Sequence, residues 1–458
     1  MTIILSVLTL FGQWSTPVNL GIAGVDDKYP QALRQQIWFG NGTLWMVWQA
    51  YRGSDWEIYS RYGGQGSWSD TLRVTNNNTN DQYPCVALDS SRYCCWCAWQ
   101  NDSAGYSDIC VARTYPWSVP VKITNDITAD HLPSIAVIGS TVWVAWERVN
   151  DIYSSYYNGT TWAAPIPVVI GAVNATPKIS ARSGHPIVVW RRYESANYDI
   201  CYSEYISNAW QAPQHVTSDP AVDSRPEIAQ GYGYLPGIYV YWQTNRDGNY
   251  EIYRTAYDTL NINYRVTTND STDANPSPLY ILYLVRLYEP ELTFMSSRKG
   301  NPDIYYQDWG STVPVDTNPS SDSFPVLTAD RRVYKWVLWQ TNRNGNSDIY
   351  GSYNYCPSEV MENISKSEPQ IEMTPNPFHD RVTISLGKNI QPPGIIRIYD
   401  AAGKAVKNML LPTACVKIPL IMTWDGTTED GKAAAPGIYF VLINSSEAIY
   451  AGKIIKLY

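Results

Sequence analysis

The chain has little charge and no excess of basic residues. Charged side chains make up 17% of its 458 residues, and 34 Lys and Arg stand against 42 Asp and Glu, which gives a net charge of -8 at pH 7. Nucleic acids and anionic membrane surfaces bind basic patches, so this balance gives no electrostatic reason to expect either partner. The sequence therefore predicts no nucleic-acid partner.

No apolar run of membrane-spanning length stands near the start of the chain. The apolar stretch 3–11 is too short to cross a bilayer, and no transmembrane span is predicted. This stretch is similar to the hydrophobic part of a secretory signal peptide, although it lacks a basic leader and has only a weak cleavage site near Gly12. We predict a signal peptide, truncated at its start, over residues 1–13; a buried first strand is the alternative.

Motifs for metal binding and nucleophilic catalysis are missing as well. The four His are scattered, and neither G-x-S-x-G, H-E-x-x-H nor a phosphate loop occurs. Eight Cys do not follow zinc-ligand spacing, because the CCxC of 94–97 has no second pair. Most Cys lie in one repeat, where they are either small buried hydrophobes or partners in a cross-strand disulfide. No metal, cofactor or catalytic residue is predicted.

The chain does have many aromatic residues and a long internal repeat. Its 36 Tyr and 19 Trp favour β-structure. The stretch 242–253, WQTNRDGNYEIY, is one of seven related copies, and in six of them an aromatic residue stands nine positions before the acid. The acids are Glu57, Asp108, Asp151, Asp199, Glu251, Asp303 and Asp348. Gaps of 43 to 52 residues between them are typical of four-stranded propeller blades.

Each repeat contains four strand-like segments. The second alternates apolar residues into the aromatic end, the third is acid-Ile-Tyr, and the fourth reads roughly W-x-x-P-x-x-V-T, as in 162–169 and 210–217. The first follows a D-x-x-P turn, whose proline suits a strand leaving a turn. Because the acid recurs in six copies, we interpret it as a structural cap and not as a catalytic group. These turn residues are Asp27, Asp81, Asp130, Asp223, Asp273 and Asp322, with Asn174 in the fourth copy.

The ends of the repeat array predict how it closes. The seventh copy lacks a fourth segment, and residues 14–20 match that segment before the first D-x-x-P turn. An N-terminal strand that completes the last sheet would remove the open ends of the array. The predicted fold is therefore all-β, with a closed seven-bladed β-propeller over 14–356; a solenoid that does not close is the alternative.

The turns of this array resemble those of a known propeller family. The N-R-D-G-N before Glu251 and the N-R-N-G-N before Asp348 are similar to the repeats of TolB-type propellers. The resemblance implies a TolB-like, sialidase-like seven-bladed architecture. It does not imply a periplasmic Tol role, because S-P-D-G is missing after the proline, and the sialidase Asp-box S-x-D-x-G-x-x-W has no match.

A polar stretch, 357–372, lacks the repeat and is predicted to be a linker. Residues 373–458 then show short alternating strands with Asp-Gly and Pro-Gly turns, which suggests a small Ig-like β-sandwich. Their order closely resembles the sorting domain of the type IX (Por) secretion system; a related Ig-like structural module is the alternative. The residues that carry the resemblance are Pro375, Asn376, Pro377, Phe378, Tyr399, Asp400, Gly403, Pro436, Gly437, Tyr439, Lys453 and Lys456.

Candidate binding residues come from two patterns. An arginine follows the aromatic strand end by four positions in copies one, five, six and seven, which are neighbours in a closed ring. Such an arc would hold an anionic glycan or a carboxylate-bearing peptide, unless each arginine pairs with a D-x-x-P acid. Aromatic residues outside the repeat pattern are candidates for exposed platforms. The two sets are Arg52, Arg246, Arg298 and Arg343, and Trp56, Trp117 and Tyr250.

The sequence thus predicts a bacterial protein that is secreted or displayed on the outer cell surface. By resemblance, its C-terminal domain contacts the outer-membrane secretion machinery. The regular repeats favour a propeller that binds an extracellular glycan or protein and is not an enzyme. A carbohydrate-active hydrolase with acids on the loop face is one alternative, and a structural or adhesive surface protein is another.

Overall fold

The structure is a computed structural model, and the part described below excludes some loops and both ends of the chain. The predicted signal peptide, 1–13, and residues 357–370 of the predicted linker lie outside it. The described residues are 14–34, 44–64, 67–89, 91–92, 94–103, 105–114, 117–230, 237–256, 258–279, 290–308, 311–329, 334–355, 371–386, 394–400, 405–410, 420–445 and 449–457.

Every regular element in these ranges is a β-strand. The chain divides into two compact units, one of residues 1–281 with 289–357 and the other of 358–458 with 282–288. Within the described ranges, no helix has the length and apolar character needed to cross a membrane.

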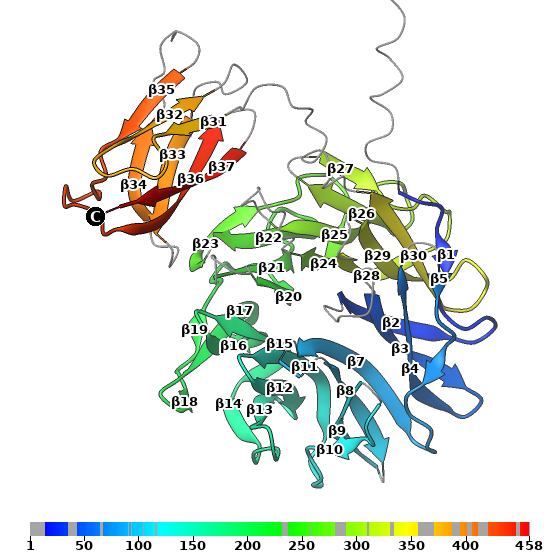
Figure 1. The fold of residues 1–458 in the computed structure, drawn as a ribbon. Coiled ribbons are helices and arrows are strands. Elements are labelled where there is room, and N and C mark those ends of the chain that lie inside the picture. The colour runs from blue at the N-terminus through cyan, green and yellow to red at the C-terminus, as the bar shows by residue number, and fades with distance from the viewer. Residues whose placement is uncertain are drawn as a thin grey trace, which may run out of the picture. The chain divides into compact units, whose positions relative to one another are not determined.

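In its described residues, the larger unit contains seven sheets of four or five antiparallel strands, which lie like the blades of a β-propeller (Figure 1). The first sheet contains β2 (Asp27–Arg34), β3 (Leu44–Arg52), β4 (Asp55–Gly64), β5 (Ser67–Trp68) and β6 (Leu72–Arg73). The second contains β7 (Asn80–Asp89), β8 (Cys94–Ser103), β9 (Tyr106–Arg113) and β10 (Val121–Lys122). The third contains β11 (Asp130–Ile138), β12 (Thr141–Arg148), β13 (Asp151–Tyr157) and β14 (Ile166–Val169).

The remaining four sheets follow the same order. The fourth contains β15 (Val173–Arg182), β16 (His185–Glu194), β17 (Asn197–Ile206), β18 (Ala209–Trp210) and β19 (Gln214–His215). The fifth contains β20 (Asp223–Gln230), β21 (Ile238–Thr244), β22 (Glu251–Ala256) and β23 (Thr259–Arg265). The sixth contains β24 (Asp273–Leu279), β25 (Glu291–Ser296), β26 (Asp303–Asp308) and β27 (Ser311–Pro314). The seventh contains β28 (Asp322–Ala329), β29 (Tyr334–Thr341), β30 (Asp348–Tyr355) and β1 (Val18–Asn19).

Hydrophobic clusters fill the spaces between the sheets. One cluster lies between each sheet and the next, because both faces of the second strands are apolar. The burial pattern of β3 illustrates this, since seven successive residues from Leu44 to Ala50 are buried. The alternating second segment of the sequence therefore packs against two neighbours at once.

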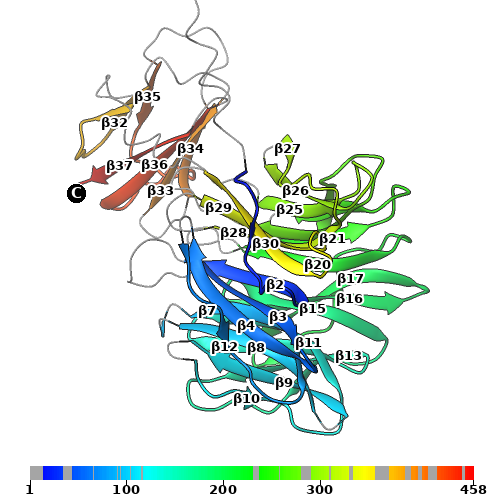
Figure 2. The ribbon, with the colours of Figure 1, turned by 90° about the vertical axis from the view of Figure 1, so that its right-hand side faces the viewer.

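The first and seventh sheets also pack against each other. They share a cluster that includes Leu20, Trp48 and Trp336. Val18 pairs with Gly351 and Asn19 with Tyr350, so β1 forms the outer strand beside β30 (Figure 2). A segment from the start of the chain thus supplies the fourth strand of the last sheet.

The smaller unit is built from two sheets around one core. Three strands form one sheet: β31 (Ile371–Thr374), β32 (Val382–Leu386) and β35 (Leu420–Trp424). Four form the other: β33 (Gly394–Asp400), β34 (Ala405–Leu410), β36 (Gly437–Ser445) and β37 (Ile449–Lys456). Trp424, Ile398 and Val441 meet in the core. Strand β31 includes the last two residues of the predicted linker.

Replacing Leu20 by Ala tests the contact between the first and last sheets. Leu20 is 2% exposed and packs in their shared cluster, so its truncation leaves a cavity. We expect the free energy of unfolding of the propeller to fall by about 2–5 kcal/mol in urea titrations. Val18→Ala is the control, because Val18 is 45% exposed on the same segment and is expected to change stability by about 0.5 kcal/mol or less. Equal losses in the two variants would contradict this account of the contact.

Candidate functional site

The D-x-x-P carboxylates lie at the start of the first strand of their sheets, and all six are 0% exposed. In the first three sheets the indole Nε1 of the aromatic strand end donates a hydrogen bond to this acid. The distances are 3.0 Å for Trp48 to Asp27, 2.8 Å for Trp99 to Asp81 and 2.8 Å for Trp146 to Asp130. In the fourth sheet Trp190 donates to Asn174 at 2.9 Å. These side chains connect the first and second strands of each sheet.

In the fifth to seventh sheets the D-x-x-P acid lies beside an arginine of the predicted arc. Arg246 lies 3.3 Å from Asp223, Arg298 lies 2.9 Å from Asp273, and Arg343 lies 3.5 Å from Asp322. Each guanidinium also lies over the ring of the acid-Ile-Tyr tyrosine, which gives a cation–π contact. Those contacts are Arg246 to Tyr253 at 4.5 Å, Arg298 to Tyr305 at 4.4 Å and Arg343 to Tyr350 at 4.1 Å.

Arg246 and Arg298 therefore bind the D-x-x-P acids of their own sheets, as the ion-pair alternative describes. Arg343 donates its hydrogen bond to Asp316, between the sixth and seventh sheets, and forms only a longer ion pair with Asp322. Arg52 differs, because it is exposed and its guanidinium lies 5.6 Å from the Tyr59 ring. Binding of an anionic ligand by these four residues stays a prediction.

Trp56 belongs to an aromatic group on the turn of the first sheet. Its ring lies 5.4 Å from that of Tyr51, and the Lys28 ammonium lies 5.1 Å from its centroid. Trp117 instead packs between the first and second sheets, 6.3 Å from Trp45. Tyr250 is half-buried, and its backbone carbonyl accepts a hydrogen bond from Asp273 N–H at 2.7 Å. Of the three predicted platforms, Trp56 is the one grouped with an exposed aromatic ring.

A set of residues that the sequence reasoning missed precedes the proline of each D-x-x-P turn. Every member has a left-handed backbone, with φ between 49° and 53°, and sits in a β-bulge where the register shifts. This conformation is strained for residues other than Gly, and bulges re-aim side chains. The seven residues, named the bulge set, are Tyr29, Tyr83, Leu132, Thr176, Arg225, Asn275 and Phe324.

Side chains of the bulge set converge. The Tyr29 ring lies 4.8 Å from Tyr83 and 4.9 Å from Phe324, and the Arg225 guanidinium lies 5.2 Å from the Phe324 ring. Arg225 is in the fifth sheet and Phe324 in the seventh, so this contact joins two sheets that are not consecutive in the chain. Arg225 is exposed, and the three aromatic residues are half-buried. We name these four residues the axial cluster.

Side chains from neighbouring sheets hold the bulges in place. The Tyr83 N–H donates to Gln49 Oε1 at 2.7 Å, and the Asn275 N–H donates to Gln243 Oε1 at 2.9 Å. Both glutamines directly follow an aromatic strand end. A satisfied N–H offsets part of the cost of the strained backbone, so the bulge set is fixed by the repeat itself.

The described cysteines do not form disulfides. Cys85, Cys94, Cys95, Cys97, Cys110 and Cys201 are free. Burial raises the pKa of Cys85 and of Cys95 to about 12, so both thiols stay protonated at neutral pH. They act as the small buried hydrophobes considered from the sequence. The described residues contain no group of three or more potential metal ligands.

The sorting-motif residues organise the smaller unit. Asn376 accepts a hydrogen bond from Ile455 N–H at 3.0 Å and donates to the Lys453 carbonyl at 2.8 Å. Phe378 is buried against Trp424, whose ring in turn contacts Tyr439. Pro375 and Pro377 follow cis peptide bonds. Gly403 lies outside the described residues; Tyr399, Asp400 and Lys456 are half-buried, and Pro436, Gly437 and Lys453 are exposed.

Residues 372–457 match the family described as "Secretion system C-terminal sorting domain". The protein is secreted or attached to the outer cell surface. This sorting domain indicates export through the type IX secretion system and interaction with its machinery. No curated protein sequence matches the chain.

Several solved structures are similar in fold. The β-propeller domain of the Trilobed protease from Pyrococcus furiosus has a TM-score of 0.47 and 9% identity, over 77% of this chain and 100% of that one. Trypanosoma rangeli sialidase has a TM-score of 0.43 and 9% identity, over 97% and 88%. PorZ, described as an essential bacterial surface component of the type-IX secretion system of Porphyromonas gingivalis, has a TM-score of 0.39 and 12% identity. The match covers 94% of this chain and 59% of PorZ. At these scores the similarities say nothing of function.

The pH dependence of stability tests the buried carboxylates. Burial raises the pKa of Asp27 from 3.8 to about 7. Between these values the folded protein keeps a proton that the unfolded chain has lost, so the free energy of unfolding falls as pH rises from about 4 to 7. Asn174 shows that Asn fits this position. We expect the melting temperature to fall less between pH 5 and pH 8 in the Asp27→Asn variant than in the wild type.

The control is Asp270→Asn, which changes an exposed carboxyl in the same propeller. Thermal melts at several pH values give both profiles. An Asp27→Asn profile parallel to that of the wild type would show that Asp27 does not carry the effect.

Proposed function

We propose that the protein is an extracellular binding protein. Its seven sheets are the blades of a closed, TolB-like propeller over 14–356, and 373–458 form an Ig-like sorting sandwich. Residues 1–13 and 357–372 are a signal peptide and a linker. The propeller binds a glycan or a protein surface and leaves its ligand chemically unchanged.

The axial cluster is the observation that carries this proposal. Three half-buried aromatic rings and one exposed guanidinium meet there on strained backbone, and the seven equivalent positions hold six different residue types. A structural requirement of the repeat would favour the same side chain in each sheet. Aromatic and arginine side chains are enriched among residues that dominate binding energies.

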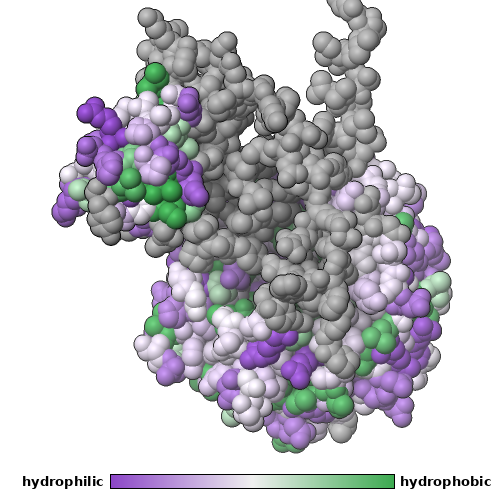
Figure 3. Space-filling model, viewed as in Figure 1, coloured by the Kyte–Doolittle hydropathy of each residue, from purple (hydrophilic) through white to green (hydrophobic). Residues whose placement is uncertain are grey.

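Among the coloured residues of the face drawn in Figure 3, apolar side chains form small green patches between polar ones. Scattered apolar residues of this kind are ordinary for a soluble surface. A localised aromatic and cationic cluster is then the better candidate for a contact site.

The hydrolase alternative needs carboxylates that reach a substrate. The six D-x-x-P acids are buried; five accept a hydrogen bond from Trp or Arg in their own sheet, and Asp322 forms an ion pair with Arg343 at 3.5 Å, which favours binding over hydrolysis. A structural or adhesive role without a small ligand remains the second alternative.

A glycan array with the full chain tests the proposal, and each glycan that binds is then incubated with protein and checked for breakdown products. We expect binding without turnover. In the Tyr29→Ala, Arg225→Ala double variant, the Kd is expected to rise about tenfold or more, which corresponds to about 1.4 kcal/mol or more. Tyr106→Ala is the matched control, because Tyr106 is 45% exposed and outside the axial cluster.

Released sugars would favour the hydrolase. An unchanged Kd in the double variant would remove the axial cluster from the site. If no glycan on the array binds, a protein ligand or a structural role becomes the better explanation.

A further inference from the structure

A tryptophan of the fourth segment packs across the boundary between sheets. It meets an aromatic ring of the preceding sheet edge to face, a favoured arrangement for aromatic pairs. The described pairs are Trp68 with Trp336 at 5.4 Å, Trp117 with Trp45 at 6.3 Å, Trp162 with Trp96 at 6.0 Å, Trp210 with Trp143 at 6.0 Å and Trp14 with Tyr306 at 5.2 Å.

The fifth sheet lacks this tryptophan. Its register is fixed by the threonine that ends the segment, because Thr217 and Thr267 accept equivalent backbone hydrogen bonds, from Ile200 and Ile252, at 2.9 Å. Seven residues before Thr217 stands Trp210, whereas seven before Thr267 stands Leu260. The sixth copy has Trp309, which lies outside the described residues. Leucine is smaller than tryptophan, so the boundary between the fourth and fifth sheets is left underfilled.

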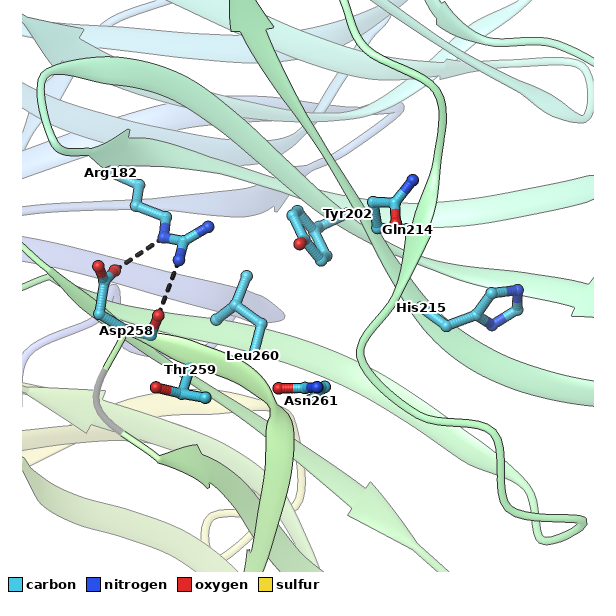
Figure 4. Close-up of a pocket in the computed structure, with 8 residues that line it drawn as sticks. All are labelled: Arg182, Tyr202, Gln214, His215, Asp258, Thr259, Leu260 and Asn261. Carbon is cyan, nitrogen blue, oxygen red and sulfur yellow. Dashed lines mark hydrogen bonds and ion pairs between the residues drawn. The ribbon is translucent and has the colours of Figure 1, made fainter.

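A pocket of about 530 Å³ lies at this boundary. The fourth sheet contributes Arg182, Tyr202, Gln214 and His215, and the fifth contributes Asp258, Thr259, Leu260 and Asn261 (Figure 4). The volume is in the usual range for small-molecule sites. In Figure 4, Tyr202 and Leu260 lie in the middle of the pocket, while His215 points away from it.

Tyr202 is the ring that a tryptophan at position 260 would meet. It stands three residues after the acid of its repeat, as Tyr306 does in the sixth copy. Tyr306 packs against Trp14, whereas Tyr202 faces Leu260 and the open pocket. The ring of Tyr202 is half-buried, so the pocket offers one apolar aromatic surface for a flat partner.

The polar rim defines the chemistry of that partner. Arg182 is bound by Asp258 at 2.7 Å and Glu204 at 3.3 Å, so the guanidinium is already neutralised by two carboxylates. An anionic ligand would gain no free positive charge from it. The Tyr202 hydroxyl and the Asn261 amide have no hydrogen-bond partner within the described ranges. These two groups are placed to bond an uncharged, hydroxylated molecule.

We infer that this pocket is a second binding site, which takes a neutral sugar ring in place of the missing indole. A pyranose has an apolar face that stacks on Tyr202 and Leu260, and hydroxyls that bond Tyr202, Asn261 and Gln214. The site is separate from the axial cluster and does not depend on the function proposed for it.

Leu260→Trp tests the site by filling it with the side chain found at this position in six other copies. The probes are neutral oligosaccharides of hexoses, pentoses and N-acetylhexosamines, with acidic oligosaccharides and free indole for comparison. Isothermal titration and saturation-transfer NMR on the full chain measure binding. We expect wild-type protein to bind a neutral probe and Leu260→Trp to weaken it more than tenfold, with a melting temperature equal to or above that of the wild type.

Val119→Trp adds an indole at a residue that is 83% exposed and is expected to bind as the wild type does. Should Leu260→Trp not fold, Tyr202→Phe and Asn261→Ala each test the rim, and we expect binding several-fold weaker in both. Binding of acidic sugars or indole in preference to neutral sugars would overturn the inference. So would no binding, or neutral-sugar binding that survives Leu260→Trp. The Tyr29→Ala, Arg225→Ala variant separates the two sites, because it is expected to leave this binding unchanged.

Discussion

A buried oxygen acceptor at the start of the first strand of each propeller sheet holds the repeat together. Six sheets use a carboxylate and one uses Asn174, so the position requires an acceptor more than a charge. The donor is an indole in some sheets and a guanidinium in others. A buried acceptor without a donor would be costly, and six sheets supply a hydrogen-bond donor for it from the end of the second strand. In the seventh sheet Arg343 forms an ion pair with Asp322 at 3.5 Å.

The strands and their order could be predicted from the sequence because they depend on local patterns. Proline after the turn, alternation into an aromatic end and the acid-Ile-Tyr segment each act within a few residues. The match of 14–20 to the fourth segment also predicted a strand beside the last repeat, and β1 pairs with β30. The sorting domain was recognisable because its turn residues occur in a characteristic order.

The side-chain partners were harder to predict, since they depend on distances between segments far apart in the chain. From the sequence, Arg246 could bind either an external anion or the Asp223 carboxylate. The fold decides between them, because it places Asp223 3.3 Å from Arg246. Trp117 looked separate from the repeat in the sequence, but it is the fourth-segment tryptophan of the second copy and packs against Trp45 of the first sheet. The sequence does not distinguish the bulge set, because its backbone conformation and contacts depend on the fold. Leu260 departs from the repeat in the sequence, but the meaning of that change depends on the residues that surround it.

The pairing of β1 with β30 has a consequence for folding kinetics. Ser15 and Ser352, which hydrogen-bond beside it, are 337 positions apart in the chain. Contacts between consecutive sheets close short loops, whereas this contact closes almost the whole propeller and carries the largest loop entropy. It is therefore the last to become favourable, after the other sheets have brought the two ends together. During synthesis β1 is made first and has no partner until the seventh repeat has been made. Until the two pair, the open edge of β30 is a site for mispairing between chains.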